Sequence, residues 1–501
     1  MTAVHQAPSA GPPPPGPPPG AVPATRRAGG PPALPGGPAA RREPRTGAAR
    51  LVPRTVASRI RAVTVLVLIG LAGMLAVTWA AVDDARDGVR VIGHDAGPQV
   101  VATGDLYTQL INMDARLADA LLIGRTPNLE AKREQALREY DNSRRSAGTA
   151  LLQAAKLADD DTEERTAREL LDAVARYEGL AGRALLLDQQ TPHTAGPPPE
   201  TVLKVYRQAT DLMKLDLLPK AYNLTLDNGT LVRHTYEDKQ NAVSDGRLWV
   251  MATGVVLLAL LVGLQLFLAA RFRRMLNPAL ALATVATLVL LGVSFTMLGG
   301  QADQLRKAKE DGFDSILALS RARAIGNSAN ADQTRFLLDP ARADTYEQIF
   351  LSKSQTILYV KADSLAQYSA AVQTPGRERE YLGFLGTEFS RTPLPGQDSA
   401  LTSVFTEYRA YQRDDRALRD QVANGQRQQA ITARLARSGS PFGTYDVALT
   451  KLIKIHQTAF DDAIEKGDGG TAGWNIVIPI AGLALVVLVL VGVRPRLSEY
   501  R

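Results

Sequence analysis

The sequence has no cysteine and few aromatic residues. Phe, Trp and Tyr together make up 6% of its 501 residues, and none of the residues is Cys. Without thiols the chain forms no disulfide, no thiolate metal site and no thiol nucleophile. Histidine is also scarce, and no two of the five have the spacing of a metal-binding helix: His5, His94, His193, His234 and His456. We therefore expect no bound metal and no cofactor.

Motifs of catalysis are missing as well. The sequence contains no glycine-rich phosphate loop and no nucleophile elbow. Its densest carboxylate run is Asp159–Asp161, followed by Glu163 and Glu164. This run fits the solvated start of a helix, because acidic side chains there complement the helix dipole. We therefore expect that the protein is not an enzyme.

Long runs without charge are present, and there are four of them. They cover residues 62–82, 248–270, 279–299 and 474–493. Each has about the 20 apolar residues that cross the hydrocarbon core of a bilayer. The first run is not a signal peptide, because about sixty residues precede it and no small-residue cleavage site follows before Asp83. The sequence therefore predicts four transmembrane helices.

Arginine marks one side of the membrane. Nine Arg and a single acid, Glu43, precede the first span, and the loop 271–278 holds three Arg and no acid. Basic residues are retained on the cytoplasmic side, so this loop and both tails, 1–58 and 494–501, are predicted to be cytoplasmic. An even number of spans independently puts both termini on one side of the plasma membrane. The charges that carry the prediction are Arg59, Arg61, Arg271, Arg273, Arg274, Arg494 and Arg496.

The three tryptophans fall at the opposite, outer ends of the spans. They are Trp79, Trp249 and Trp474. An indole ring favours the membrane interface, because its body is apolar while its N–H needs a polar partner. We therefore predict that all three are membrane-interface residues.

The tail 1–58 is rich in Pro, Gly, Ala and Arg. Such a segment cannot bury enough apolar surface to offset the entropy of ordering it, so we expect disorder with polyproline character. The tail is either a docking strip for a cytoplasmic partner, a basic strip on anionic lipid, or dispensable.

The two segments outside the membrane, 83–247 and 300–473, are similar in length. Each contains a helix-breaking sequence about forty residues after its span, at Leu117–Gly124 and at Gln333–Pro340. Forty helical residues extend roughly 60 Å, and about four such lengths fit into each segment. The sequence thus predicts an all-α membrane protein with four transmembrane helices and two extracytoplasmic four-helix-bundle, sensor-like domains, each continuous with a pair of spans.

Apolar residues at helical spacing support these bundles. The stripe in the first bundle is Leu106, Leu110, Met113, Leu117 and Leu121. The stripe in the second bundle, which Lys353 interrupts, is Tyr346, Phe350, Ile357, Val360 and Ser364.

Three polar residues near these stripes are candidates for a special role. Arg116 and Arg335 lie at equivalent heights in the two bundles. Either Arg is able to bind a ligand carboxylate, but a solvated or intra-bundle salt bridge is the favoured interpretation. His456 has the spacing of a residue that lines the bundle seam. The ligand-binding residues therefore stay unknown at this stage.

A bundle helix that runs unbroken into a span can transmit a piston, tilt or rotation across the bilayer. The loop 271–278 and the tail 494–501 are too short to hold an output domain. A signal that crosses the membrane must therefore be received by a separate cytoplasmic protein.

The paired order of span, bundle, span, short basic loop, span, bundle and span, without cysteine or an effector domain, resembles the actinobacterial GlnX family of membrane proteins. The resemblance covers residues 55–501. It implies an external solute-binding lipoprotein (GlnH) that reports aspartate, glutamate or a related amino acid. It also implies a cytoplasmic serine/threonine kinase (PknG) as the receiver. No binding residue is carried over, because no family motif maps onto named positions.

Three functions are compatible with this organisation. The first is a signal relay between an amino-acid-binding lipoprotein and a Ser/Thr kinase. The second is a chemoreceptor-like sensor that binds small ligands directly, and the third is a structural scaffold of the envelope. A small-residue stripe in the first span, Ala72, Ala76 and Ala80, is compatible with a homodimer, although plain helix packing is the commoner cause of such stripes.

Overall fold

The computed structural model describes residues 56–156, 161–272, 277–374, 376, 380–391, 393–436 and 440–498. The chain divides into two compact units, Met1–Pro53 and Arg54–Arg501. The first unit, and with it most of the predicted cytoplasmic tail, lies outside the described residues, as do Arg273, Arg274 and Asp159. The following description concerns the second unit.

The described residues are almost entirely helical. Their one β feature is an isolated antiparallel bridge between Tyr359 and Leu382. The predicted all-α fold is therefore confirmed.

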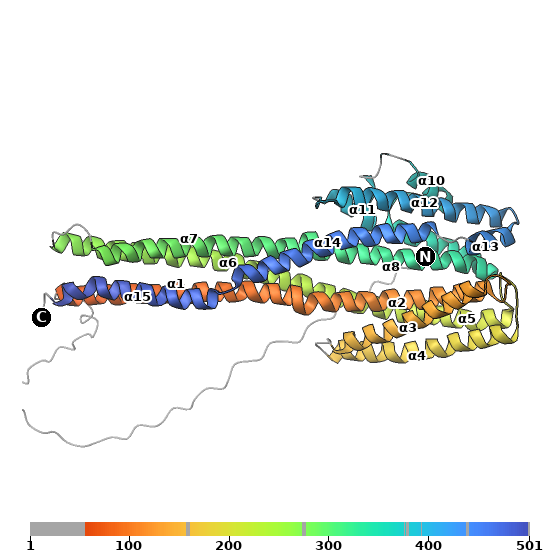
Figure 1. Cartoon of the computed structure of the whole chain (residues 1–501), viewed down its shortest axis with the longest axis horizontal. Coiled ribbons are helices and arrows are strands. Elements are labelled where there is room, and N and C mark those ends of the chain that lie inside the picture. Colours follow the sequence, from red (N-terminus) through yellow and green to blue (C-terminus); the bar gives the residue numbers. More distant parts are fainter. Residues whose placement is uncertain are drawn as a thin grey trace, which may run out of the picture. The chain divides into compact units, whose positions relative to one another are not determined.

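The first half of the sequence forms four helical lengths that run up and down (Figure 1). Three short π-helical segments, η2, η3 and later η4, interrupt the α-helices without ending them. The elements of the first half are α1 Val56–Arg90, η2 Val91–Asp95, α2 Ala96–Ile123, α3 Glu130–Lys156, α4 Asp161–Gln190, α5 Glu200–Leu212, η3 Met213–Leu217 and α6 Leu218–Phe272.

The second half repeats this plan with added short helices. Its elements are α7 Pro278–Arg306, η4 Lys307–Phe313, α8 Asp314–Leu338, η5 Pro340–Arg342, α9 Ala343–Ile357, α10 Leu365–Val372, α11 Gly383–Ser390, α12 Gln397–Ala423, α13 Arg427–Ala436, α14 Pro441–Thr471 and α15 Trp474–Ser498.

The stripe predicted for the second bundle is wrong at its far end. Helix α9 stops at Ile357, because the chain turns extended and Tyr359 N donates to Leu382 O at 2.8 Å. Ser364 begins the next helix, where its hydroxyl accepts from the N–H of Gln367. Val360 and Ser364 therefore do not continue the frame of Tyr346, Phe350 and Ile357.

Both predicted helix ends are confirmed. Helix α2 ends at Ile123, and Gly124 follows with φ +57°. A Cβ at Gly124 would lie 2.5 Å from the carbonyl oxygen of His193. The turn therefore requires glycine for two reasons, the positive φ and the lack of space for a side chain. Helix α8 ends at Leu338, directly before Asp339 and Pro340. We refer to this end of the unit as the distal end and to the opposite end, where α1 starts and α15 ends, as the span end.

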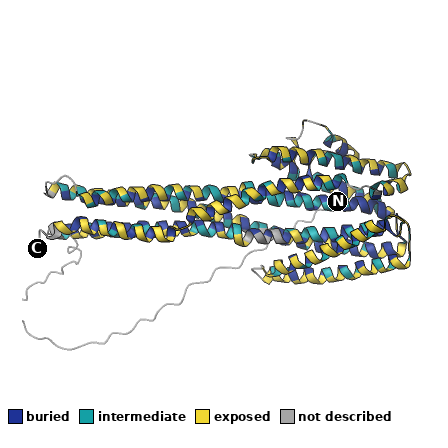
Figure 2. Ribbon diagram, in the orientation of Figure 1, coloured by how far each residue is buried: buried dark blue, intermediate teal, exposed yellow. Residues whose placement is uncertain are grey.

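Four helical stretches are long and apolar enough to cross a membrane. They are Ser58–Asp95, Val232–Ala270, Pro278–Leu338 and Pro441–Pro495. Large apolar side chains cover their outer faces, where Leu66 is 50% and Leu483 67% exposed. Figure 2 shows buried stripes facing inward along these helices and exposed outer faces. An apolar belt of this extent is stable in lipid rather than in water.

Three of these stretches continue unbroken to or toward the distal end. The helical run from α1 through η2 into α2 has no break, and the same holds for α6 and for the run from α7 through η4 into α8. The fourth differs from the prediction. Ala472 and Gly473 separate α14 from α15, and Gly473 has φ +79°. The change of direction is visible in Figure 1.

Cysteine labelling tests the expected orientation, because the native chain has no cysteine to remove. We expect T194C and N424C, both exposed at distal-end turns, to react in intact cells with a membrane-impermeant maleimide. R494C, at the span end, should react only after the cells are opened. Labelling of R494C from outside would reverse the topology.

Candidate functional site

The two halves share one hydrophobic cluster at the distal end. Leu117 and Tyr206 from the first half pack in the same buried cluster as Phe336, Leu338 and Ile431 from the second. The two bundles are therefore joined through a continuous core, an arrangement that their separate periodicities did not predict.

Arg335 lies in the centre of this junction. Its guanidinium on α8 donates from Nη2 to Asp114 Oδ2 on α2 at 2.5 Å and from Nη1 to Asp332 Oδ1 at 2.6 Å. Arg335 is 2% exposed, and both carboxylates are buried. The predicted intra-bundle salt bridge of Arg335 is present with Asp332 on the same helix, but it is buried rather than solvated. The bond to Asp114, which belongs to the other half, was not predicted.

Two lysines complete the group of charges. Lys214 Nζ on η3 lies 2.9 Å from Asp332 Oδ1, and Lys353 Nζ on α9 bonds Asp332 Oδ2 and, at 2.6 Å, Ser328 Oγ. Three cations thus face two carboxylates. We refer to these five residues as the charge cluster: Asp114, Lys214, Asp332, Arg335 and Lys353.

The surplus of positive charge shows in the ionisation of the charge cluster. Burial alone would raise the pKa of Asp332, but the attraction of Lys214, Lys353 and Arg335 outweighs it and holds that pKa well below its usual value. Burial lowers the pKa of Lys353 to about 8, and repulsion from the other two cations adds to this effect. Burial lowers the pKa of Lys214 as well, so both lysines lose a proton more readily than a lysine in water.

Neutral donors surround the other carboxylate. Tyr177 Oη donates to Asp114 at 3.1 Å and Thr210 Oγ1 at 2.7 Å. Burial raises the pKa of Tyr177 well above 10, so the phenol keeps its proton and stays a donor. Among the described residues, Asp114 forms a salt bridge with Arg335 alone, whereas Asp332 forms three.

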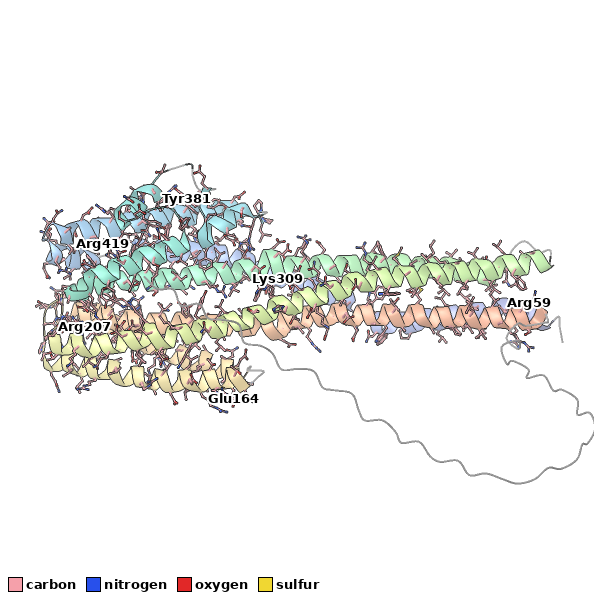
Figure 3. The ribbon with its side chains drawn as sticks, turned by 180° about the vertical axis from the view of Figure 1, so that it is seen from behind. Arg59, Glu164, Arg207, Lys309, Tyr381 and Arg419 are labelled. Atoms are coloured by element: carbon pink, nitrogen blue, oxygen red, sulfur yellow. The ribbon has the colours of Figure 1, made fainter. Side chains whose placement is uncertain are left out.

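Less buried ion pairs extend the junction around the charge cluster. Arg207 on α5 forms a bidentate pair with Asp339 at 2.8 and 2.6 Å, and Arg342 pairs with Asp211 at 2.8 Å. Figure 3 shows Arg207 at the distal end and Arg59 at the span end. Arg116 pairs with Asp119 at 2.8 Å within its own bundle, as predicted.

A cavity of about 920 Å³ lies between the charge cluster and the spans. Helices α2, α6, α8 and α14 line it, so both halves contribute. Tyr107 and Tyr222 form one wall, with ring centroids 5.8 Å apart, and Phe313 and Phe460 are further lining residues. The size is that of a pocket for a small molecule.

Close helix packing separates the cavity from the spans. A Cβ on Gly93 in η2 would lie 2.8 Å from Ile464, and one on Gly312 in η4 would lie 2.7 Å from Phe460. We refer to η2, η4 and the facing residues 460–470 of α14 as the neck. Figure 3 places Lys309, on η4, in this part of the unit.

His456 lies at the edge of the neck. It is 1% exposed, and its Nδ1 is 2.6 Å from the carbonyl oxygen of Asp311 on η4. The prediction that His456 lines the bundle seam is confirmed.

The predicted interface residues lie at one level along the helices but differ in burial. Trp79 and Trp249 are 45% and 64% exposed, as a ring in contact with lipid headgroups requires. Trp474 is buried against Val82 and Ile478 instead. The small-residue stripe of α1, Ala72, Ala76 and Ala80, is exposed and does not serve packing within the described chain.

The predicted topology charges gather at the span end where the structure describes them. Arg59 and Arg61 lie in the first turns of α1, and Arg494 is exposed near the end of α15. Asn277 Nδ2 bonds the carbonyl oxygen of Gly492 at 2.5 Å, which brings the start of α7 to the same level. The side chains of Arg271 and Arg496 lie outside the described parts.

One segment of the first half contributes residues to both the cavity and the charge cluster. Residues 88–237 match the family model of an actinobacterial sensor domain. This sensor domain runs from the end of α1 into α6, and it contributes Asp114, Lys214 and Tyr222. The match supports a protein of the actinobacterial sensor type, with a role in sensing or signalling. Neither the curated proteins nor the solved structures gave a match.

The charge cluster provides a comparison of two variants. R335M leaves Asp114 buried without a cation, which costs about 3–5 kcal/mol, and we expect the melting temperature of the full chain to fall by on the order of 10 °C. K353M leaves Asp332 with Lys214 and Arg335, so its loss should be clearly smaller. Thermal unfolding in detergent measures both. Equal losses would show that Arg335 is not the central contact.

Proposed function

We propose that the protein is a signal relay of the plasma membrane, with both termini in the cytoplasm. The observation that carries this proposal is the continuity of three helical runs between the distal end and the spans. A packed helix is stiff along its axis, so a displacement in the sensor domain reaches the span without being absorbed by a loop.

The neck supplies an element that can switch. A π-helical turn contains an extra residue, and conversion to α-helix rotates the chain on one side by about 100° relative to the other. Segments η2 and η4 occupy equivalent places in the two halves, between the cavity and a span. Both pack against α14 through glycine, so their states are coupled.

The partners follow from the resemblance to the GlnX family. In this proposal an amino-acid-binding lipoprotein that responds to aspartate or glutamate acts on the sensor domain from outside. A Ser/Thr protein kinase receives the signal at the cytoplasmic ends of the spans. In this proposal the role is non-enzymatic. The match of residues 88–237 to a sensor domain supports the sensing or signalling part of the proposal.

Direct sensing of a small ligand is a second candidate. The cavity favours it, because four helices from both halves line a space large enough for a small molecule. Binding there would change the spacing of the helices immediately above the neck.

Co-purification tests the relay. We expect the full chain, extracted from native membranes in mild detergent, to bring down both a solute-binding lipoprotein and a Ser/Thr kinase. A version without residues 1–58 shows whether the tail holds the kinase. Recovery of neither partner by the full chain would contradict the proposal.

A matched pair of substitutions at Leu110 tests the continuity of the helix. Leu110 is fully buried on α2, and both L110A and L110P remove its packing. Only proline breaks the helix, at an extra cost of about 3 kcal/mol. We expect L110A to keep the response of kinase-substrate phosphorylation to external glutamate and L110P to abolish it, with both proteins present in the membrane. A response that survives in L110P would exclude transmission through this helix.

A further inference from the structure

The cavity on the distal side of the neck is lined by an arginine that forms no ion pair within the described part of the chain. Arg321 on α8 lines the cavity, and its Nε is buried and makes no hydrogen bond. Its guanidinium lies over the ring of Tyr222 on α6, 5.6 Å from the centroid. No carboxylate among the described residues pairs with it.

A second arginine of the same helix, unlike Arg321, has a carboxylate partner. Arg323, two residues later on the same helix, forms a bidentate pair with Asp446 at 2.7 and 2.8 Å. Burial lowers the pKa of Arg321, whereas the bonds to Asp446 raise that of Arg323. The contact with Tyr222 offsets only part of the cost of burying Arg321, and no ion pair within the described protein offsets the rest.

The remaining lining residues favour an anion. With Arg323 neutralised by Asp446, three lining cations remain against two lining carboxylates: Arg321, Lys451 and Lys454 against Asp105 and Asp461. The excess of positive charge attracts a negatively charged molecule and repels a cation.

The uncharged lining residues indicate the rest of the ligand. Tyr107, Phe313 and Phe460 present apolar surface, and the amides of Gln109 and Asn112 line the same space without a hydrogen bond inside the described chain. A simple inorganic anion would leave the aromatic surface unused. An organic molecule with an apolar body uses both.

We propose that this cavity is a binding site for a small organic carboxylate with an apolar body, in which Arg321 holds the carboxylate. The planar guanidinium presents two parallel N–H donors that match the two oxygens of a carboxylate. The body of the ligand lies against the aromatic residues of α2, α6, η4 and α14. The inference rests on the proposed sensing function in one respect, because it treats the bound ligand as a signal. Whether the ligand binds is measured independently of that function.

Occupation of the site has a mechanical consequence. The ligand neutralises Arg321 and draws α8 and α6 toward the same molecule. These helices enter the neck and the spans directly below, so the bound state favours one arrangement of the neck over another.

The test uses the full chain in lipid nanodiscs, with phenylacetate as the probe and phenylacetamide as its uncharged counterpart. Binding is followed by saturation-transfer NMR of the probe and by thermal unfolding. We expect phenylacetate to bind and to raise the melting temperature, and phenylacetamide to bind at least tenfold more weakly. Equal binding of acid and amide would overturn the role of Arg321.

Variants locate the site. R321M should weaken phenylacetate binding at least tenfold, whereas R183M, which removes an exposed arginine of α4 outside the cavity, should not change it. Without ligand, R321M should melt at or above the wild-type temperature, because an unpaired charge is removed, and R323M should melt below it. A lower melting temperature for R321M would show that Arg321 has a structural partner and would overturn the proposal. R321K provides the same binding comparison if R321M does not fold.

Two further outcomes are decisive. Displacement of phenylacetate by equimolar inorganic phosphate would show a site for the anionic group alone and overturn the apolar part of the proposal. Absence of probe binding to the wild type would overturn the site while leaving the relay intact. Failure to recover partners, with probe binding retained, would count against the relay and not against the site.

Discussion

The packing of the two halves against each other depends on the buried contact between Arg335 and Asp114. Both side chains are buried. If the two halves moved apart, a buried charge would be left without its counter-charge, which is energetically costly. The contact also fixes register, because the guanidinium fork bridges α2 and α8 at one height only. The hydrophobic cluster around this contact stabilises the packing of the two halves, but apolar contacts permit small shifts of one helix along another. A hydrogen-bonded pair of charges does not permit such shifts.

This constraint arranges the rest of the outer region. With the distal end held together, the four long helices diverge enough below it to enclose a cavity, and they close again where glycines of η2 and η4 meet α14. The distal end is fixed by the charge cluster, and the neck is tightly packed. The helices that line the cavity between them are therefore the part of the outer region that can move. In the proposed relay, a small change in the spacing of these walls is passed to the neck, where conversion of a π-helical turn to α-helix would provide a second arrangement.

The all-α class, the four membrane-length helices and the ends of α2 and α8 could be predicted from the sequence, because each rests on local pattern: charge-free length, helical spacing and a breaker such as Gly124. The junction of the two halves could not be predicted from the sequence. Asp114 follows Met113 directly in a core stripe, and Lys353 interrupts another, so both were signals of a buried polar group. Their partners, however, lie more than a hundred residues away or on another helix, and helical periodicity carries no information about such pairing. The same applies to Arg321, whose lack of a partner is visible only once the neighbouring helices are in place.

The break at Gly473 makes the two halves unequal. Three spans are rigid extensions of the outer helices, whereas α15 is attached through a residue with a left-handed backbone and can tilt while α14 stays in position. Within the lipid α15 packs beside α1 and α7, which belong to different halves. The last span can therefore change its tilt independently of the outer helices, whereas the other three spans follow theirs. The distance at the span end between the last turns of α15 and the first turn of α1 is accordingly the one that the outer helices fix least.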